Sequence, residues 1–141
     1  MLNFVKRKAI IFQESIDGKR CVAVDAQNAE ALFTYITQDA RHEKKFRHIV
    51  ELILNGLRNT ELYDKETIND QAKGVTAMKL FKGQENDRIY CKEFTTAGKT
   101  FVVVAAELRE KKKSQKNKQI EINLIETVAT YEYEFENPGR D

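Results

Sequence analysis

The densest positive charge of the chain lies in residues 109–118, directly after its most apolar run, Phe-Val-Val-Val-Ala-Ala at 101–106. Six cationic side chains stand among these ten residues against a single glutamate: Arg109, Lys111, Lys112, Lys113, Lys116 and Lys118. Such side chains repel one another unless water or an anion lies over them. A polyanion such as nucleic acid is therefore a candidate ligand, and a solvated join between two elements is the equal alternative.

A second set of cationic and aromatic residues lies before and after this segment. Its members are Lys79, Lys82, Arg88, Tyr90, Tyr131 and Tyr133. In a sheet of neighbouring antiparallel strands they can converge on one edge or face. There Lys and Arg would contact phosphates, and a Tyr or guanidinium plane would stack an unpaired base. Two structural alternatives stay open: Arg88 pairing with Glu107, and Tyr131 packing in a helical apolar stripe.

These residue types suffice for metal-independent cleavage of RNA. The 2′-hydroxyl of the RNA is the nucleophile, so the protein needs a base for its proton, cations for the charge that builds on the phosphate, and an acid for the leaving 5′-oxygen. The chain has no glycine-rich nucleotide-binding, serine-nucleophile or zinc-binding motif. His42 and His48 are six positions apart, which is not the spacing of a helical metal pair. We expect both histidines to lie at the surface or at its boundary. We expect the protein to use neither a metal nor a cofactor.

Composition narrows the class of protein. The chain has 141 residues, 41% of them hydrophobic and 33% charged, with a net charge of +2, which is typical of one globular domain over residues 1–141. Its longest apolar run is far too short to span a membrane, and the basic N-terminal residues lack the apolar core of a signal peptide. Cys21 and Cys91 have no CxxC spacing, which favours reduced, buried thiols and a cytoplasmic location.

The first half of the chain predicts a hairpin followed by two helices. Residues 8–25 contain two β-favouring runs with Asp-Gly at the turn between them. Asp25 is expected to cap one helix. Asp39 is expected to cap a second, longer helix that ends at about Gly56. Because the break between them is short, the helices are expected to form an antiparallel hairpin. The charged, irregular segment 58–74 predicts a loop.

The second half predicts three strands and a helix. The strands are expected at 75–81, 88–94 and 100–108, and the last is apolar on both sides, as in the middle of a sheet covered on both faces. The loop before it contains Ala-Gly, which suits a left-handed residue. Apolar residues at helical spacing over 120–131 predict the final helix, and the acidic tail 132–141 is expected to fray.

Together these elements predict an α+β fold. It consists of an antiparallel sheet of about four to five strands, a helical hairpin on one face and a C-terminal helix, in the order β-α-α-β-β-β-α.

The C-terminal half resembles the RelE/HigB-like type II toxins of the RelE/ParE superfamily, including their phage-derived relatives. The resemblance rests on Met-Lys-Leu-Phe-Lys-Gly at 78–83, Arg-Ile-Tyr at 88–90, and Lys-Lys-Lys-Ser-Gln-Lys at 111–116 after an apolar strand. This is similar to the family order K-x-L-K-G, R-hydrophobic-Y, apolar strand, K-K-[ST]-Q-K. The chain departs from the family at 105–110, where members commonly have an aromatic or histidine, and at 84–87, which leaves no room for a further strand.

The resemblance implies a bacterial toxin that cleaves mRNA on the ribosome, is silenced by a cognate antitoxin protein, and needs no membrane. It implies catalytic positions at Lys79, Lys82, Arg88 and Tyr133, with Tyr131 as the alternative tyrosine. We expect Arg88 to stabilise the transition state and Lys79 or Lys82 to transfer a proton. The resemblance also implies that RNA is bound by Arg109, Lys111, Lys112, Lys113, Lys116 and Lys118.

Two alternatives to this function remain, and the oligomeric state is open. The first is a gyrase-inhibiting toxin similar to ParE. The second is a non-catalytic nucleic-acid-binding or interaction protein of the same fold.

Overall fold

The computed structural model describes residues 3–66, 72–81, 87–110 and 118–136. These residues form an α+β fold with one seven-stranded mixed sheet and three helices. The strands are β1 (Val5–Glu14), β2 (Arg20–Asp25), β3 (Tyr63–Lys65), β4 (Val75–Met78), β5 (Arg88–Thr95), β6 (Phe101–Arg109) and β7 (Tyr131–Phe135). The helices are α1 (Ala29–Ile36), α2 (Ala40–Leu54) and α3 (Lys118–Ala129).

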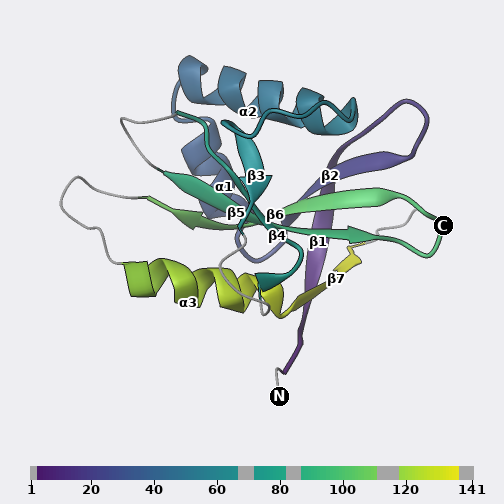
Figure 1. Ribbon diagram of the computed structural model, residues 1–141. Helices are drawn as coiled ribbons and strands as arrows, with labels where there is room; N and C mark the ends of the chain where they lie inside the picture. The colour runs from purple at the N-terminus through teal and green to yellow at the C-terminus, as the bar shows by residue number, and fades with distance from the viewer. Residues whose placement is uncertain (1–2, 67–71, 82–86, 111–117, 137–141) are drawn as a thin grey trace.

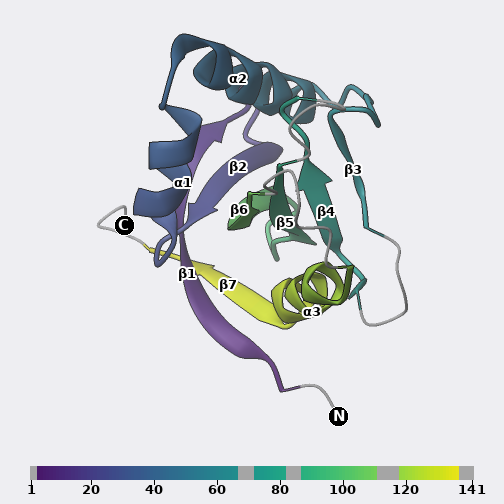
Figure 2. The same ribbon diagram turned by 90° about the vertical axis from the view of Figure 1, so that its left-hand side faces the viewer.

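The sheet separates the helices into two layers, with α1 and α2 over one face and α3 over the other (Figure 1). Its strand order is β3-β4-β5-β6-β2-β1-β7, and its curvature carries β1 and β7 round toward α3 (Figure 2). All described neighbours pair antiparallel except β2 with β6 and β1 with β7, which are parallel. The α+β class is confirmed, but the expectation of about four to five strands, all antiparallel, is wrong.

The apolar strand is central, as its composition predicts. β6 has three strands on each side of it in the described sheet, and residues 102–106 are fully buried. Val103 packs in the core beneath α1 and α2, whereas Ala106 packs in the core beneath α3. A strand with water on neither face can be apolar at every position, which explains the missing alternation.

The predicted hairpin and one of the two predicted caps are confirmed. β1 and β2 pair antiparallel around a turn in which Gly18 has a φ of 72°, a left-handed value that favours glycine. Asp39 accepts a hydrogen bond from the His42 backbone amide at 2.8 Å and so caps α2. In the later hairpin loop the left-handed residue is Lys99, with a φ of 70°, and not the adjacent glycine.

The arrangement of the two helices differs from the expectation. They follow each other along the chain on one face, but they cross instead of lying antiparallel (Figures 1 and 2). The residue before α1 is Asn28, so Asp25 does not cap this helix. Its carboxylate accepts hydrogen bonds from Arg7 and Tyr133, and from the backbone amides of Gln27 and Asn28 before the helix begins.

Two segments that lacked a clear pattern form edge strands. β3 lies inside the expected loop 58–74 and pairs with β4. β7 lies where the tail was expected to fray, and it pairs with β1; residues 137–141 of that tail lie outside the described residues. Tyr131 therefore belongs to a strand and not to the final helix, which ends at Ala129. None of the described helices is long and apolar enough to cross a membrane.

The buried carboxylate of Asp25 joins β1, β2 and β7. The Arg7 guanidinium donates to it twice, at 2.6 and 3.0 Å, and the Tyr133 hydroxyl donates at 2.6 Å. The backbone amides of Gln27 and Asn28 add two further hydrogen bonds. The Asp25 side chain is 0% exposed, so its charge is tolerated only because these donors replace water.

Replacing Asp25 by Asn is expected to lower the free energy of unfolding by about 3–5 kcal/mol, because Arg7 then remains as an uncompensated, largely buried cation. Urea unfolding followed by circular dichroism measures the loss. Glu134→Gln is the matched control, since it removes a pair at 3.6 Å between side chains that are 55% and 58% exposed. That control should change stability by about 0.5 kcal/mol or less. Equal, small losses in both variants would contradict the structural role of Asp25.

Candidate nucleic-acid interface

β5 begins and β6 ends side by side, at the left of Figure 1, and an arginine stands at each of these two strand ends. Arg88 and Arg109 are partners in the strand register. Arg88 is two positions from Tyr90, which packs beneath α3, so Arg88 projects from that same face. Lys79 follows β4 on the neighbouring strand, where its amide donates to the Leu62 carbonyl at 2.7 Å. The fold thus gathers three of the predicted cationic residues at one end of the sheet.

This cationic end forms no direct ion pair within the described residues. None of the side chains of Lys79, Arg88 and Arg109 forms a direct ion pair with a described carboxylate, and the Arg109 Nε is buried without a hydrogen-bond partner among the described residues. The alternative pairing of Arg88 with Glu107 is not formed, because Glu107 lies opposite Tyr90 and accepts the Tyr131 hydroxyl. Like charges directly opposite on one face destabilise a sheet. A bound anion would relieve that repulsion.

The structure adds one acidic residue, Glu66, that sequence reasoning missed. Its amide donates to the Val75 carbonyl at 2.9 Å, which holds it beside β4. Burial raises the pKa of the Glu66 carboxyl above its usual value, while the nearby charges of Arg88 and Lys79 lower it and those of Glu121 and Asp64 raise it. The Glu66 charge therefore interacts with the charges of Arg88 and Lys79, although its backbone lies beside Val75 at the start of β4 and Lys79 follows the end of that strand. Glu66 stands in the irregular segment 58–74, where the sequence has no pattern that would single it out.

Tyr90 forms part of the wall of this site and not a free stacking platform. It is only 1% exposed, and its hydroxyl donates to Glu121 of α3 at 3.5 Å. Burial, together with the nearby Glu121 and Glu66 carboxylates, raises the pKa of Tyr90, so the phenol stays protonated. A base cannot stack on a ring that α3 and the sheet already cover.

The two C-terminal tyrosines are engaged elsewhere. Tyr133 donates to Asp25, and Tyr131 donates to Glu107 while the Arg7 guanidinium stacks 4.1 Å from its ring centre. Burial, and then these carboxylates, raise the pKa of both phenols above the usual value. The structure brings Lys79, Arg88 and Arg109 together, but it joins Tyr131 and Tyr133 to the Asp25 network.

The remaining predicted residues lie outside the described residues: Lys82, Lys111, Lys112, Lys113 and Lys116. The residues that flank them are described, and they meet at the same end of the sheet as Arg88. Arg109 closes β6, and exposed Lys118 opens α3. Both lysine-bearing segments therefore connect to the cationic end of the sheet.

The residues on either side of the segment that holds Lys82, Phe81 and Asp87, contact side chains of α1 and α2. The Asp87 carboxylate accepts the Tyr35 hydroxyl at 3.1 Å. The Phe81 ring lies 4.8 Å from the His42 ring and 3.7 Å from the Arg41 guanidinium. His42 is thus buried, contrary to our expectation, because its ring packs between Tyr35 and Phe81 and its Nδ1 lies 2.8 Å from Asp39.

No three His, Cys, Asp or Glu side chains in the described ranges gather in a group that could hold a metal ion. No protein-family model matches the chain, and neither a curated protein nor a solved structure matches it.

The pKa of Glu66 is expected to exceed that of an ordinary glutamate when it is measured from carboxyl carbon shifts in an NMR titration. Arg88→Gln removes a cation that lowers this pKa, so the pKa should rise further in that variant. Lys44→Gln, at an exposed position on α2, is the matched control and should leave the Glu66 pKa unchanged. An ordinary pKa that Arg88→Gln leaves unmoved would mean that the two side chains are not neighbours.

The raised pKa of Glu66 also determines whether the stability of the fold rises or falls with pH. Because the pKa is higher in the folded than in the unfolded chain, Glu66 lowers stability as the pH rises from the unfolded pKa to the folded one. Glu66→Gln should therefore lose less stability over that interval than the wild type does in urea unfolding at a series of pH values. A larger loss in the variant would contradict a raised Glu66 pKa.

Proposed function

We propose that this protein is an RNA-cleaving toxin of a type II toxin–antitoxin pair, which binds mRNA at the end of the sheet where Arg88 faces Arg109. The observation that carries the proposal is this pair of opposed arginines with Lys79 beside them and no direct acidic partner among the described residues. An RNA phosphate supplies the missing negative charge, and guanidinium groups bind phosphate through paired hydrogen bonds.

In sequence, four lysines stand between Arg109 and Lys118. Phosphate contacts of this kind position a nucleic acid without reading its sequence. Recognition of particular bases would then come from other groups, which include the ribosome if cleavage takes place there.

The residues at the site can perform the cleavage without a metal. The 2′-oxygen of the RNA bonds to the adjacent phosphorus, and its proton passes to the Glu66 carboxylate, whose raised pKa makes it a better base than an ordinary glutamate. Arg88 stabilises the added negative charge on the phosphorane. The bond from phosphorus to the 5′-oxygen breaks, and the Lys79 ammonium donates a proton to that oxygen. The products are a cyclic 2′,3′-phosphate and a free 5′-hydroxyl.

Glu66 changes the expected division of roles. A lysine is mostly protonated at neutral pH, which suits an acid, whereas a carboxylate is mostly ionised, which suits a base. Lys79 then serves as the acid, and Lys82 remains a second candidate for that role. Tyr133 is left out of the proposed chemistry because its proton is already donated to Asp25.

The remaining parts of the proposal rest on the resemblance to RelE/HigB-like toxins. They are action on mRNA at the ribosome, in the cytoplasm, and inhibition by a cognate antitoxin. An antitoxin that presents acidic side chains to Arg88 and Arg109 would occupy the same charges as the RNA.

Induced expression in bacteria tests the function. The wild type should slow growth and produce discrete, translation-dependent cuts in mRNA by primer extension. The Lys79→Ala, Arg88→Ala double variant should not slow growth, and its cleavage should fall by about 100-fold or more, because the transition-state charge loses its stabilisation. The matched control is Lys44→Ala with Arg47→Ala, which removes the same charge from exposed positions on α2 and should be as toxic as the wild type.

Other outcomes contradict the assignment in distinguishable ways. A toxic double variant would remove Lys79 and Arg88 from the mechanism. Growth arrest with altered DNA supercoiling and uncut mRNA would identify a gyrase inhibitor. Salt-dependent RNA binding without cleavage would identify a non-catalytic binding protein.

A further inference from the structure

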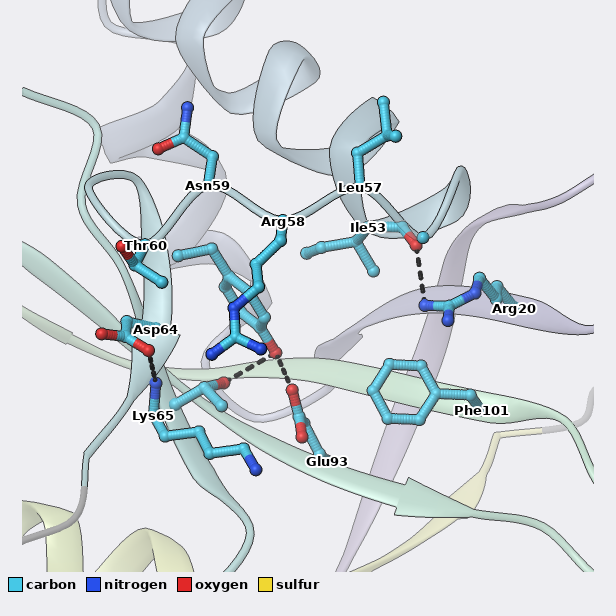
Figure 3. A pocket seen from close by; sticks show the side chains of 13 residues that line it. Arg20, Ile53, Leu57, Arg58, Asn59, Thr60, Asp64, Lys65, Glu93 and Phe101 are labelled. Atoms are coloured by element: carbon cyan, nitrogen blue, oxygen red, sulfur yellow. Dashed lines mark hydrogen bonds between the residues drawn. The ribbon is translucent and has the colours of Figure 1, made fainter.

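A pocket of about 270 Å³ lies beside the end of α2, where it takes in Glu93 of β5 and Phe101 at the start of β6 (Figure 3). It is lined by the end of α2, the chain that follows this helix, the first residue of β2, and strands β3 to β6. Its volume is just below the range of about 300–1,000 Å³ that is typical of small-molecule sites. None of the residues proposed to bind or cleave RNA lines it.

The floor of the pocket is a chain of hydrogen bonds. The Thr76 hydroxyl donates to the Tyr63 hydroxyl at 2.8 Å, and Tyr63 donates to the Glu93 carboxylate at 2.6 Å. Burial, with Cys91 and Glu93 nearby, raises the pKa of Tyr63, so this phenol keeps its proton. One Glu93 oxygen is therefore occupied, and the floor is rigid and polar.

Three cations surround this floor. Arg20 is fixed, because it donates to the Ile53 carbonyl at 3.1 Å and stacks 5.1 Å from the Phe101 ring centre. Gly56 leaves room for it: a Cβ at this position would lie 3.3 Å from the guanidinium carbon, and its φ of +67° also favours glycine. The Arg20 guanidinium is thus held at the rim of the pocket.

The other two cations are not fixed by described partners. Arg58 extends into the pocket from the chain after α2, and Lys65 enters it from β3 (Figure 3). Neither side chain forms an ion pair or hydrogen bond with any other described residue. Against the three cations the lining holds two carboxylates, Asp64 and Glu93, and Glu93 is already bonded to Tyr63.

The wall beside Arg20 is apolar. Phe101 offers a half-buried ring and Ile53 a buried aliphatic side chain, and both line the pocket. A ligand that fits this lining has one anionic group for Arg58 and Lys65 and a flat or apolar body that covers the ring. Such a division, a mostly apolar wall with a few convergent polar groups, is usual for small-molecule sites.

We propose that this pocket binds a small molecule in which a phosphate or carboxylate is joined to a planar or apolar body. Arg58 and Lys65 hold the anionic group, and Phe101 and Ile53 contact the body. The limited volume favours a small molecule over a protein segment. The site is separate from the proposed RNA interface, so it stands or falls independently of RNA cleavage.

The test is an NMR titration of the ¹⁵N-labelled full chain with phenyl phosphate, benzoate, inorganic phosphate and phenol. Phenyl phosphate or benzoate should give saturable shifts at the Gly56, Arg58, Lys65 and Phe101 amides. Whichever of these two compounds binds more tightly shows whether the pocket prefers a phosphate or a carboxylate. Inorganic phosphate should bind more weakly because it has no body, and phenol more weakly because it has no charge.

Variants decide whether the shifts come from this site. Arg58→Gln and Lys65→Gln should each weaken binding by about tenfold or more, as expected for a lost hydrogen bond to a charged group. Lys8→Gln, an exposed position on β1, should leave the affinity unchanged. The spectra report at once whether each variant is folded. The proposal is overturned if neither anion gives saturable shifts at these amides, or if Arg58→Gln binds as tightly as the wild type.

Discussion

The buried charge of Asp25 is the constraint on which the fold depends. A carboxylate with no access to water is tolerated only with full compensation, and here Arg7, Tyr133 and two backbone amides provide it. Because Arg7 lies on β1 and Tyr133 on β7, this network holds together the parallel pair of strands at one edge of the sheet. It also commits the Tyr133 hydroxyl proton and two nitrogens of the Arg7 guanidinium to Asp25.

Other charged side chains among the described residues lack the compensation that Asp25 has. Arg88 and Arg109 face each other from the central pair of strands without direct acidic partners among the described residues. On the opposite face, Arg58 and Lys65 enter a pocket without described partners. Cations that repel one another cost stability, and they are retained where an anionic ligand offsets that cost. The sheet holds these two groups apart, on different faces.

The sequence predicted the parts of the fold that depend on local pattern. The apolar run before Glu107 identified the central strand, and Asp39 identified the start of α2. β7 was missed although Tyr131, Tyr133 and Phe135 alternate with glutamates, because the preceding helical spacing was extended through Tyr131. Glu66 was not predictable, since only the pairing of β3 with β4 brings it near Arg88. Asp25 has the sequence context of a helix cap, but its side-chain partners, Arg7 and Tyr133, are far away in the chain.

The central claim is that Arg88 and Arg109 together bind an RNA phosphate. Its most direct test is an NMR titration of the full chain with a short single-stranded RNA whose 2′-hydroxyls are methylated, so that it binds without being cut. The account predicts salt-dependent shifts of the Arg88 and Arg109 side-chain Nε–H signals and of the Lys79 amide, with little change at Arg58 and Lys65. Shifts confined to Arg58 and Lys65, or no shifts at Arg88 and Arg109 at saturating RNA, would contradict it.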